Sequence, residues 1–244
     1  MPTPPAKLSR DAIVEALCEV RFESQGIAEV IVGQLAGAPA WAGARAERLP
    51  LADFPASARE SNAEMRFAPI MQVLGPDAGR TVRIGSHVLS MHLMAPYVGW
   101  AAFKPMLDQM LAALFDVCKD PSIARIGLRY INALTPDHGF DGLQDLNFEL
   151  VAGGRPVRDL TAAYRYDVAS DAVAQVTLAT PAFVQGAIDS RVCAVVDVDV
   201  FTPDSLGQVS LHEASAWIER AHDEEKKAFF SLWPDAILNS MTEQ

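Results

Sequence analysis

Hydrophobic and polar residues alternate one by one in several stretches of the chain, and this period of two predicts β-strands. In residues 12–23, Cys18 and Val20 fall on one face, whereas Glu15 and Glu19 fall on the other. One face of this strand is therefore expected to be buried and the other to be polar. Similar patterns predict strands over 64–74, 80–94, 123–134, 162–169, 172–179 and 190–201.

Apolar residues at helical spacing predict three amphipathic helices, over 27–36, over 101–118 and from Ser210 to Pro234. The last has the clearest start, because Ser210 and Glu213 form an S-x-x-E capping box. Pro234 ends it, and Pro105 is expected in the first turn of the second helix, where a proline is tolerated.

Residues 37–63 are rich in Ala, Gly, Pro and Ser and predict a long connection, with Trp41 and Phe54 as its attachments to the core. The sequence GPDAG at 75–79 predicts a hairpin turn between two strands.

Tandem hairpins require antiparallel pairing, and the helices are too few for a doubly wound parallel sheet. The expected fold is therefore α+β, with a mainly antiparallel, curved sheet and amphipathic helices packed on one face. We expect one domain over 7–244 and a disordered segment over 1–6. The halves 7–135 and 136–244 have similar element orders, which leaves a duplicated architecture open.

The 244 residues are 50% hydrophobic and 21% charged, which suits a globular domain. No apolar run approaches the 18 residues of a membrane span, and the start of the chain lacks the apolar core of a signal peptide. We therefore expect a cytoplasmic protein without a membrane partner. The net charge of −11 argues against nucleic acid as a partner, because phosphate binding needs a basic surface.

Four segments occur in a recognisable order: IVEALCEVRFE at 13–23, APYVGW at 95–100, RIGLRYINAL at 125–134 and AHDEEKKAFF at 221–230. Together they resemble a sporadically distributed family of uncharacterised bacterial proteins of about this size. The family has no established activity, so the resemblance implies no catalytic residues. Its patchy occurrence implies a gene that travels with mobile or defence modules.

Two arginines, Arg125 and Arg129, share one face of the strand over 123–134, and Asp197 and Asp199 share one face of the strand over 190–201. A desolvated guanidinium needs a partner, so we expect Arg129 to pair with one of the aspartates. Glu15 and Glu19 are alternative partners. The two aspartates could instead hold a metal, although no His or Glu stands at a diagnostic spacing, and we expect no metal site.

A functional alternative makes the same region an anion or ligand site. Its candidate residues are Arg125, Arg129, Tyr130, Asn132 and His222. His222 borders the apolar stripe of the last helix, so it is expected to be a partly buried histidine with a satisfied ring. The alternative for His222 is an acid or base that faces a cleft.

Tyr97 and Trp100 follow a break at Pro96. They are expected to pack on the next helix, or alternatively to form an exposed aromatic anchor for a protein partner.

The chain has no P-loop, no G-x-G-x-x-G and no G-x-S-x-G, so we expect no cofactor and the sequence leans away from an enzyme. The hypothesis is a non-enzymatic binding or regulatory protein that acts through a protein partner in a bacterial accessory or defence-type module. A homodimer is left open. The alternative is an enzyme or small-molecule binder with an anion pocket around Arg125, Arg129 and Tyr130.

Overall fold

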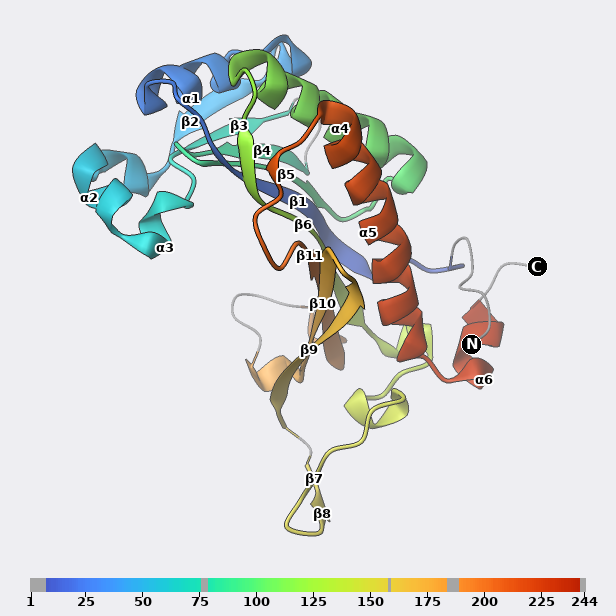
Figure 1. The fold of residues 1–244 in the computed structure, drawn as a ribbon. Coiled ribbons are helices and arrows are strands. Elements are labelled where there is room, and N and C mark those ends of the chain that lie inside the picture. The colour runs from blue at the N-terminus through green and yellow to red at the C-terminus, as the bar shows by residue number, and fades with distance from the viewer. Residues whose placement is uncertain (1–7, 76–78, 158, 184–188, 242–244) are drawn as a thin grey trace.

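The computed structural model describes residues 8–75, 79–157, 159–183 and 189–241. A ten-stranded antiparallel sheet runs through the molecule in the order β2-β3-β4-β5-β1-β6-β11-β10-β9, with β12 beside β6. The sheet is curved and stays open, with β2 and β9 at its two edges (Figure 1). Its strands are β1 (Ile13–Glu23), β2 (Arg45–Arg48), β3 (Met71–Leu74), β4 (Arg80–Ile84), β5 (Val88–Met94), β6 (Ser122–Leu134), β9 (Thr161–Ala169), β10 (Ala172–Ala179), β11 (Ala194–Phe201) and β12 (Gly207–Gln208).

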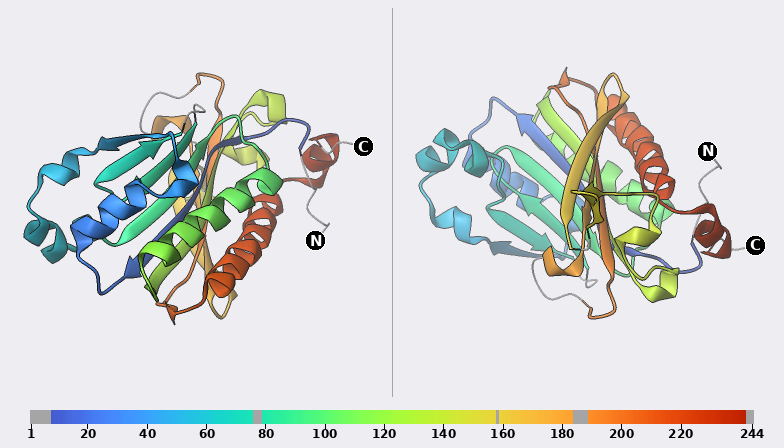
Figure 2. Two further views of the ribbon diagram at one scale, coloured as in Figure 1. Left: turned by 90° about the horizontal axis from the view of Figure 1, so that it is seen from above. Right: turned by 90° about the horizontal axis from the view of Figure 1, so that it is seen from below.

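Three helices cover one face of this sheet: α1 (Ala28–Ala36), α4 (Trp100–Val117) and α5 (Leu211–Ser231) (Figure 2). The core lies between these helices and the apolar faces of the central strands, and includes Cys18, Leu128 and Val198, all fully buried. The predicted α+β class, with an antiparallel curved sheet, is therefore confirmed.

Short elements complete the described chain. They are α2 (Ala56–Ser61), α3 (Ala63–Arg66), α6 (Asp235–Met241), the hairpin of β7 (Val151–Ala152) and β8 (Arg155–Pro156), and the 3-10 turns Pro39–Trp41, Pro50–Asp53, Pro136–His138, Leu143–Asp145 and Pro181–Phe183. No helix in the described ranges has the length and apolar character needed to cross a bilayer.

Several boundaries differ from the sequence-based expectations. The connection over 37–63 contains β2, α2 and two 3-10 turns, and although Trp41 is buried, Phe54 is half exposed. The strand predicted over 64–74 begins with α3, and the one predicted over 80–94 is two strands, β4 and β5, joined by a tight turn. Gly85 donates to the carbonyl of Val88 in that turn, which the alternating pattern does not reveal.

The ends of the helices differ less. The capping box of α5 is confirmed, because the Ser210 hydroxyl accepts from the Glu213 amide and the Glu213 carboxylate accepts from the Ser210 amide. Pro105 lies in the second turn of α4 rather than the first. Residues 1–6 and the centre of the GPDAG turn lie outside the described residues.

Both halves of the chain contribute to the single sheet, since β6 of the first half pairs with β11 of the second. Buried residues from both halves form one continuous core. The duplication of the two halves stays a prediction.

Candidate ligand-binding pocket

The pocket originates in a stagger between two antiparallel helices, α4 and α5. Asp108 of α4 accepts a hydrogen bond from the Ser215 hydroxyl of α5 at 2.6 Å. Further along, Trp100, the first residue of α4, donates through Nε1 to Glu219 at 3.0 Å. Since α4 begins there while α5 continues to Ser231, no helix of the described residues lies beside the second half of α5 on this side.

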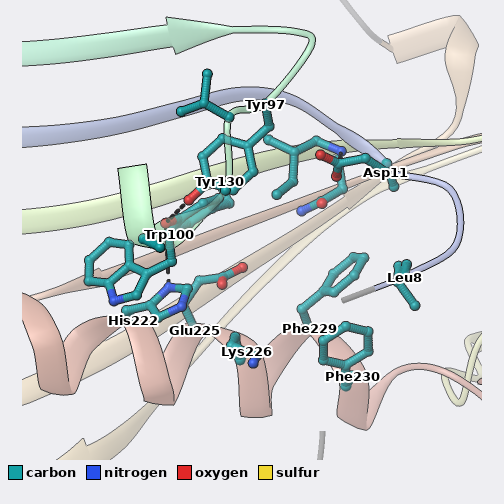
Figure 3. A pocket seen from close by; sticks show the side chains of 16 residues that line it. Leu8, Asp11, Tyr97, Trp100, Tyr130, His222, Glu225, Lys226, Phe229 and Phe230 are labelled. Atoms are coloured by element: carbon teal, nitrogen blue, oxygen red, sulfur yellow. Dashed lines mark hydrogen bonds between the residues drawn. The ribbon is translucent and has the colours of Figure 1, made fainter. Parts of the chain in front are cut away.

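A cavity of about 570 Å³ occupies the space beyond the start of α4 (Figure 3). Its floor is β6, its walls are α5 and the turn before α4, and the segment that leads into β1 closes it. The lining consists of Leu8, Asp11, Ala12, Ile13, Tyr97, Val98, Gly99, Trp100, Ala101, Tyr130, Asn132, His222, Glu225, Lys226, Phe229 and Phe230. This volume is in the range of pockets that hold small organic molecules.

Gly99 sets the point at which α4 begins. Its backbone has φ 86° and ψ 155°, a region that is essentially restricted to glycine. No side chain of the described residues caps the helix there. The start of α4, and with it the wall of the cavity, therefore depends on this glycine.

A chain of hydroxyl and imidazole groups lines one side of the cavity. The Tyr97 and Tyr130 hydroxyls lie 3.1 Å apart, and the Tyr130 hydroxyl lies 3.4 Å from Nδ1 of His222. Burial raises the pKa of both tyrosines above the ordinary value, so both phenols stay protonated at neutral pH.

His222 is held neutral in this chain. The Trp100 ring lies flat against the imidazole, with centroids 3.9 Å apart and planes 10° apart. Burial, assisted by the charge of Lys226, lowers the pKa of His222 to about 4. His222 is partly buried and its ring contacts the Tyr130 hydroxyl, as expected from the sequence, whereas a role as an acid or base stays a prediction.

Glu225 is the most unusual residue of the pocket. Its side chain comes from α5 and points into the cavity (Figure 3), yet only 5% of the residue is exposed. No described residue gives its carboxyl group a hydrogen bond. Burial raises the pKa of Glu225 to about 8, against a smaller opposite effect of Lys226, so the group is mostly protonated at neutral pH.

Asn132 is also buried in the lining, at 1% exposure. Its Nδ2 donates to the carbonyl of Val196 at 3.3 Å, which fixes the amide against β11. Asn132 and Tyr130 alternate with Arg129 along β6, so they face the helices whereas the arginines face the open side of the sheet.

The predicted anion pocket around Arg125, Arg129 and Tyr130 is therefore not assembled. Arg129 donates through Nε to Asp197 at 2.8 Å, and Arg125 donates through Nη2 to Asp199 at 2.7 Å. Arg125 also lies 3.3 Å from Glu19. Both arginines are engaged by carboxylates on the face of the sheet away from Tyr130.

Asp197 and Asp199 are therefore occupied by these ion pairs, as expected of structural carboxylates. Arg129 pairs with Asp197, and Arg125 pairs with Asp199. In the described parts of the chain, no group of three or more His, Cys, Asp or Glu side chains is arranged to hold a metal ion.

Tyr97 and Trp100, suggested as an aromatic anchor for a partner, pack against other rings of the fold. Tyr97 packs edge-on against Phe103 and Tyr130, at centroid distances of 6.0 and 5.7 Å. Trp100 packs edge-on against Phe103 and stacks on His222. Both side chains therefore belong to the wall of the pocket, which corresponds to the packing alternative of the sequence analysis.

The sequence-based hypotheses grouped Tyr130, Asn132 and His222 with the two arginines and kept Tyr97 and Trp100 apart as a partner anchor. The structure brings these five residues together without the arginines. Glu225 was missed altogether. A signal was present, because Glu225 lies four residues after Ala221 and four before Phe229, in the apolar stripe of α5. A carboxylate at a stripe position is a reason to expect a buried acid.

Comparisons with known proteins add little. No family model matches the chain, and no curated protein matches it. Among solved structures, it resembles the substrate-free duplicated taurocyamine kinase from Schistosoma mansoni, at 12% identity and a TM-score of 0.38. The match covers 93% of this chain but 34% of that one, so this chain spans about a third of the length of the kinase. A likeness this weak assigns no activity.

Proposed function

We propose that this protein binds a small organic molecule in the cavity between α5, β6 and the start of α4. The observation that carries the proposal is the buried carboxyl group of Glu225, which has no hydrogen-bond partner among the described residues and points into a cavity of about 570 Å³. Titratable side chains with strongly shifted pKa values in a concave, mostly apolar pocket are a common feature of functional sites.

Stability alone would favour a different residue at position 225. A buried polar group without a hydrogen-bond partner costs free energy, of the order of 1–3 kcal/mol. An apolar side chain at the same stripe position would avoid this cost and extend the core towards Phe229. A ligand that bonds to the carboxyl group would offset the cost and account for the acid.

The lining suits a molecule with an apolar body. Five aromatic rings contribute to the cavity, from Tyr97, Trp100, Tyr130, Phe229 and Phe230. Few polar groups accompany them, and these come from several different elements, which is the usual division between affinity and orientation in a ligand pocket.

The role through a protein partner, in a defence-type module, stays a prediction from the sequence. Its suggested anchors, Tyr97 and Trp100, use their rings within the fold. The pocket therefore favours the small-molecule alternative, at a different place from the one the arginines suggested.

A fragment screen followed by two-dimensional NMR tests the proposal. Small aromatic compounds should shift the indole signal of Trp100 and the amides of the 97–101 turn. A matched pair of variants tests whether the compounds bind in this cavity. Ala101→Phe narrows the cavity, whereas Ala102→Phe makes the same change at an exposed neighbour outside the lining. Shifts that vanish in the first variant and persist in the second support the proposal. A library that leaves every lining residue unshifted overturns it.

A further inference from the structure

Resting on the proposed function, we infer that the ligand is an organic cation: a protonated amine on an apolar or aromatic body, with its ammonium group paired to the carboxylate of Glu225. The inference combines the place of this carboxyl group in the cavity with the character of the surrounding walls.

The carboxyl group of Glu225 is nearly buried and points into the cavity. With 5% exposure, this group has little contact with bulk water, and no described side chain or backbone amide hydrogen-bonds to it. A ligand in the cavity would provide the complementary group. An ammonium group provides both a hydrogen-bond donor and a charge, and charge-assisted hydrogen bonds are roughly twice as strong as neutral ones.

The walls of the cavity are rich in aromatic side chains. Tyr97, Tyr130, Phe229 and Phe230 place aromatic rings around the cavity. The faces of aromatic rings attract cations, with a gain of about 0.5–2 kcal/mol for each well-placed pair. An aromatic enclosure that also contains a carboxylate is a suitable environment for an ammonium group.

Few of the other groups that line the cavity around Glu225 are charged. His222 is neutral, and the phenols of Tyr97 and Tyr130 are protonated, so none of them repels a cation. Asp11 adds a carboxylate at the exposed rim, and Lys226 is the opposing charge. Lys226 is partly exposed, and its long side chain can keep its ammonium group in water.

Binding of the cation would then release the proton of Glu225 to the buffer. In the empty pocket Glu225 is mostly protonated near pH 7, given its pKa of about 8. The amine arrives already protonated and keeps its proton, whereas the Glu225 O–H bond breaks and its proton passes to the buffer. The inference therefore predicts the release of nearly one proton for each cation bound at neutral pH, and none for a neutral ligand.

Isothermal titration calorimetry with three matched probes tests this: 3-phenylpropylammonium, 3-phenylpropanol and 3-phenylpropanoate. The amine should bind at least tenfold more tightly than the alcohol. Its apparent enthalpy should differ between phosphate and Tris buffers by the amount expected for proton release. This measurement on the unmodified protein does not depend on any variant being folded.

Glu225→Gln provides the second readout, since it keeps the shape of the side chain but cannot ionise. It should lose the tenfold preference for the amine and the proton release, while its affinity for the alcohol changes little. Glu224→Gln is the matched control, because Glu224 is the adjacent acid and pairs with Lys227 outside the pocket.

The outcomes separate the two proposals. If the alcohol binds in the pocket as tightly as the amine, or the propanoate binds most tightly, the cation inference is overturned while the pocket remains a ligand site. If none of the three probes binds, the assignment of a ligand to this pocket is overturned together with the inference.

Discussion

Trp100 and His222 form a parallel ring stack across the interface between α4 and α5, with their centroids 3.9 Å apart. The indole covers one face of the imidazole, and the Tyr130 hydroxyl lies beside Nδ1. Trp100 is held in place by its hydrogen bond to Glu219. One tryptophan thus joins the two helices and keeps water from the histidine.

Replacing this tryptophan should change the titration of the histidine. Trp100→Ala exposes the imidazole, so the pKa of His222 should rise from about 4 towards its ordinary value of 6.5. The pKa is measured from the ring proton shifts of His222 as a function of pH. Trp100→Phe keeps a ring against the imidazole and should give a smaller rise. An unchanged pKa in the alanine variant would contradict the role given to the stack.

Glu225 should make the protein less stable as the pH rises. Its pKa in the folded protein, about 8, lies above the value of 4.5 for a free glutamate, so the unfolded chain loses its proton first. The free energy of unfolding should therefore fall between about pH 4.5 and pH 8, by at most about 1.4 kcal/mol per pH unit, and this contribution is constant above pH 8.

Glu225→Gln removes this pH dependence, because glutamine does not titrate. Its stability relative to the unmodified protein should increase from pH 5 to pH 8, as measured by urea unfolding at each pH. Glu224→Gln serves as the control and should show no comparable trend. Parallel stability curves for the Glu225→Gln and unmodified proteins would show that Glu225 is ionised in the fold.

Of the two arginine–aspartate ion pairs on the open face of the sheet, the one with the more buried arginine should have the larger coupling energy. Arg125 and Asp199 have side chains that are 21% and 19% exposed, whereas Arg129 is 41% exposed. A double-mutant cycle on Arg125 and Asp199 should give a coupling energy of about 1–2 kcal/mol, larger than the coupling between Arg129 and Asp197. Equal or reversed coupling energies would disagree with this arrangement.

The capping box of α5 should contribute measurably to stability. Ser210→Ala removes the hydroxyl that accepts from the Glu213 amide at 3.2 Å, and should lower the free energy of unfolding by about 1 kcal/mol. Ser210→Thr retains the hydroxyl, which accepts from the Glu213 amide and donates to the Glu213 carboxylate, and should recover most of the loss. Chemical denaturation of the three proteins at one pH provides the measurement.

The parts of the fold that were predicted correctly depend on local patterns. Alternation in β1 and β11 gave their strands and faces, and the capping box and Pro234 marked α5. Errors arose where a local turn or cap signal stood inside a longer strand pattern. The turn between β4 and β5 contains Gly85 and Ser86, a hairpin signal that the continuous prediction over 80–94 passed over. Similarly, α3 begins at a cap on Asn62 that the strand pattern concealed.

The site could be predicted only in pieces for a similar reason. Its residues come from the segment before β1, the 97–101 turn, β6 and α5, and only the tertiary fold brings them together. The alternation of β6 placed Tyr130 and Arg129 on opposite faces, yet the anion hypothesis grouped them. Glu225 was hidden among several charged neighbours, where its stripe position is easily overlooked.

The staggered ends of α4 and α5 make the pocket adjustable. Because α4 begins at Trp100, one additional turn at its start would extend over the space above Tyr130 and Asn132. Changes confined to residues 95–99 could therefore enlarge, shrink or fill the cavity without disturbing the pairing of the sheet. Divergent sequences of this fold would be expected to vary in ligand preference first in this turn, while the packing of α5 on the sheet is retained.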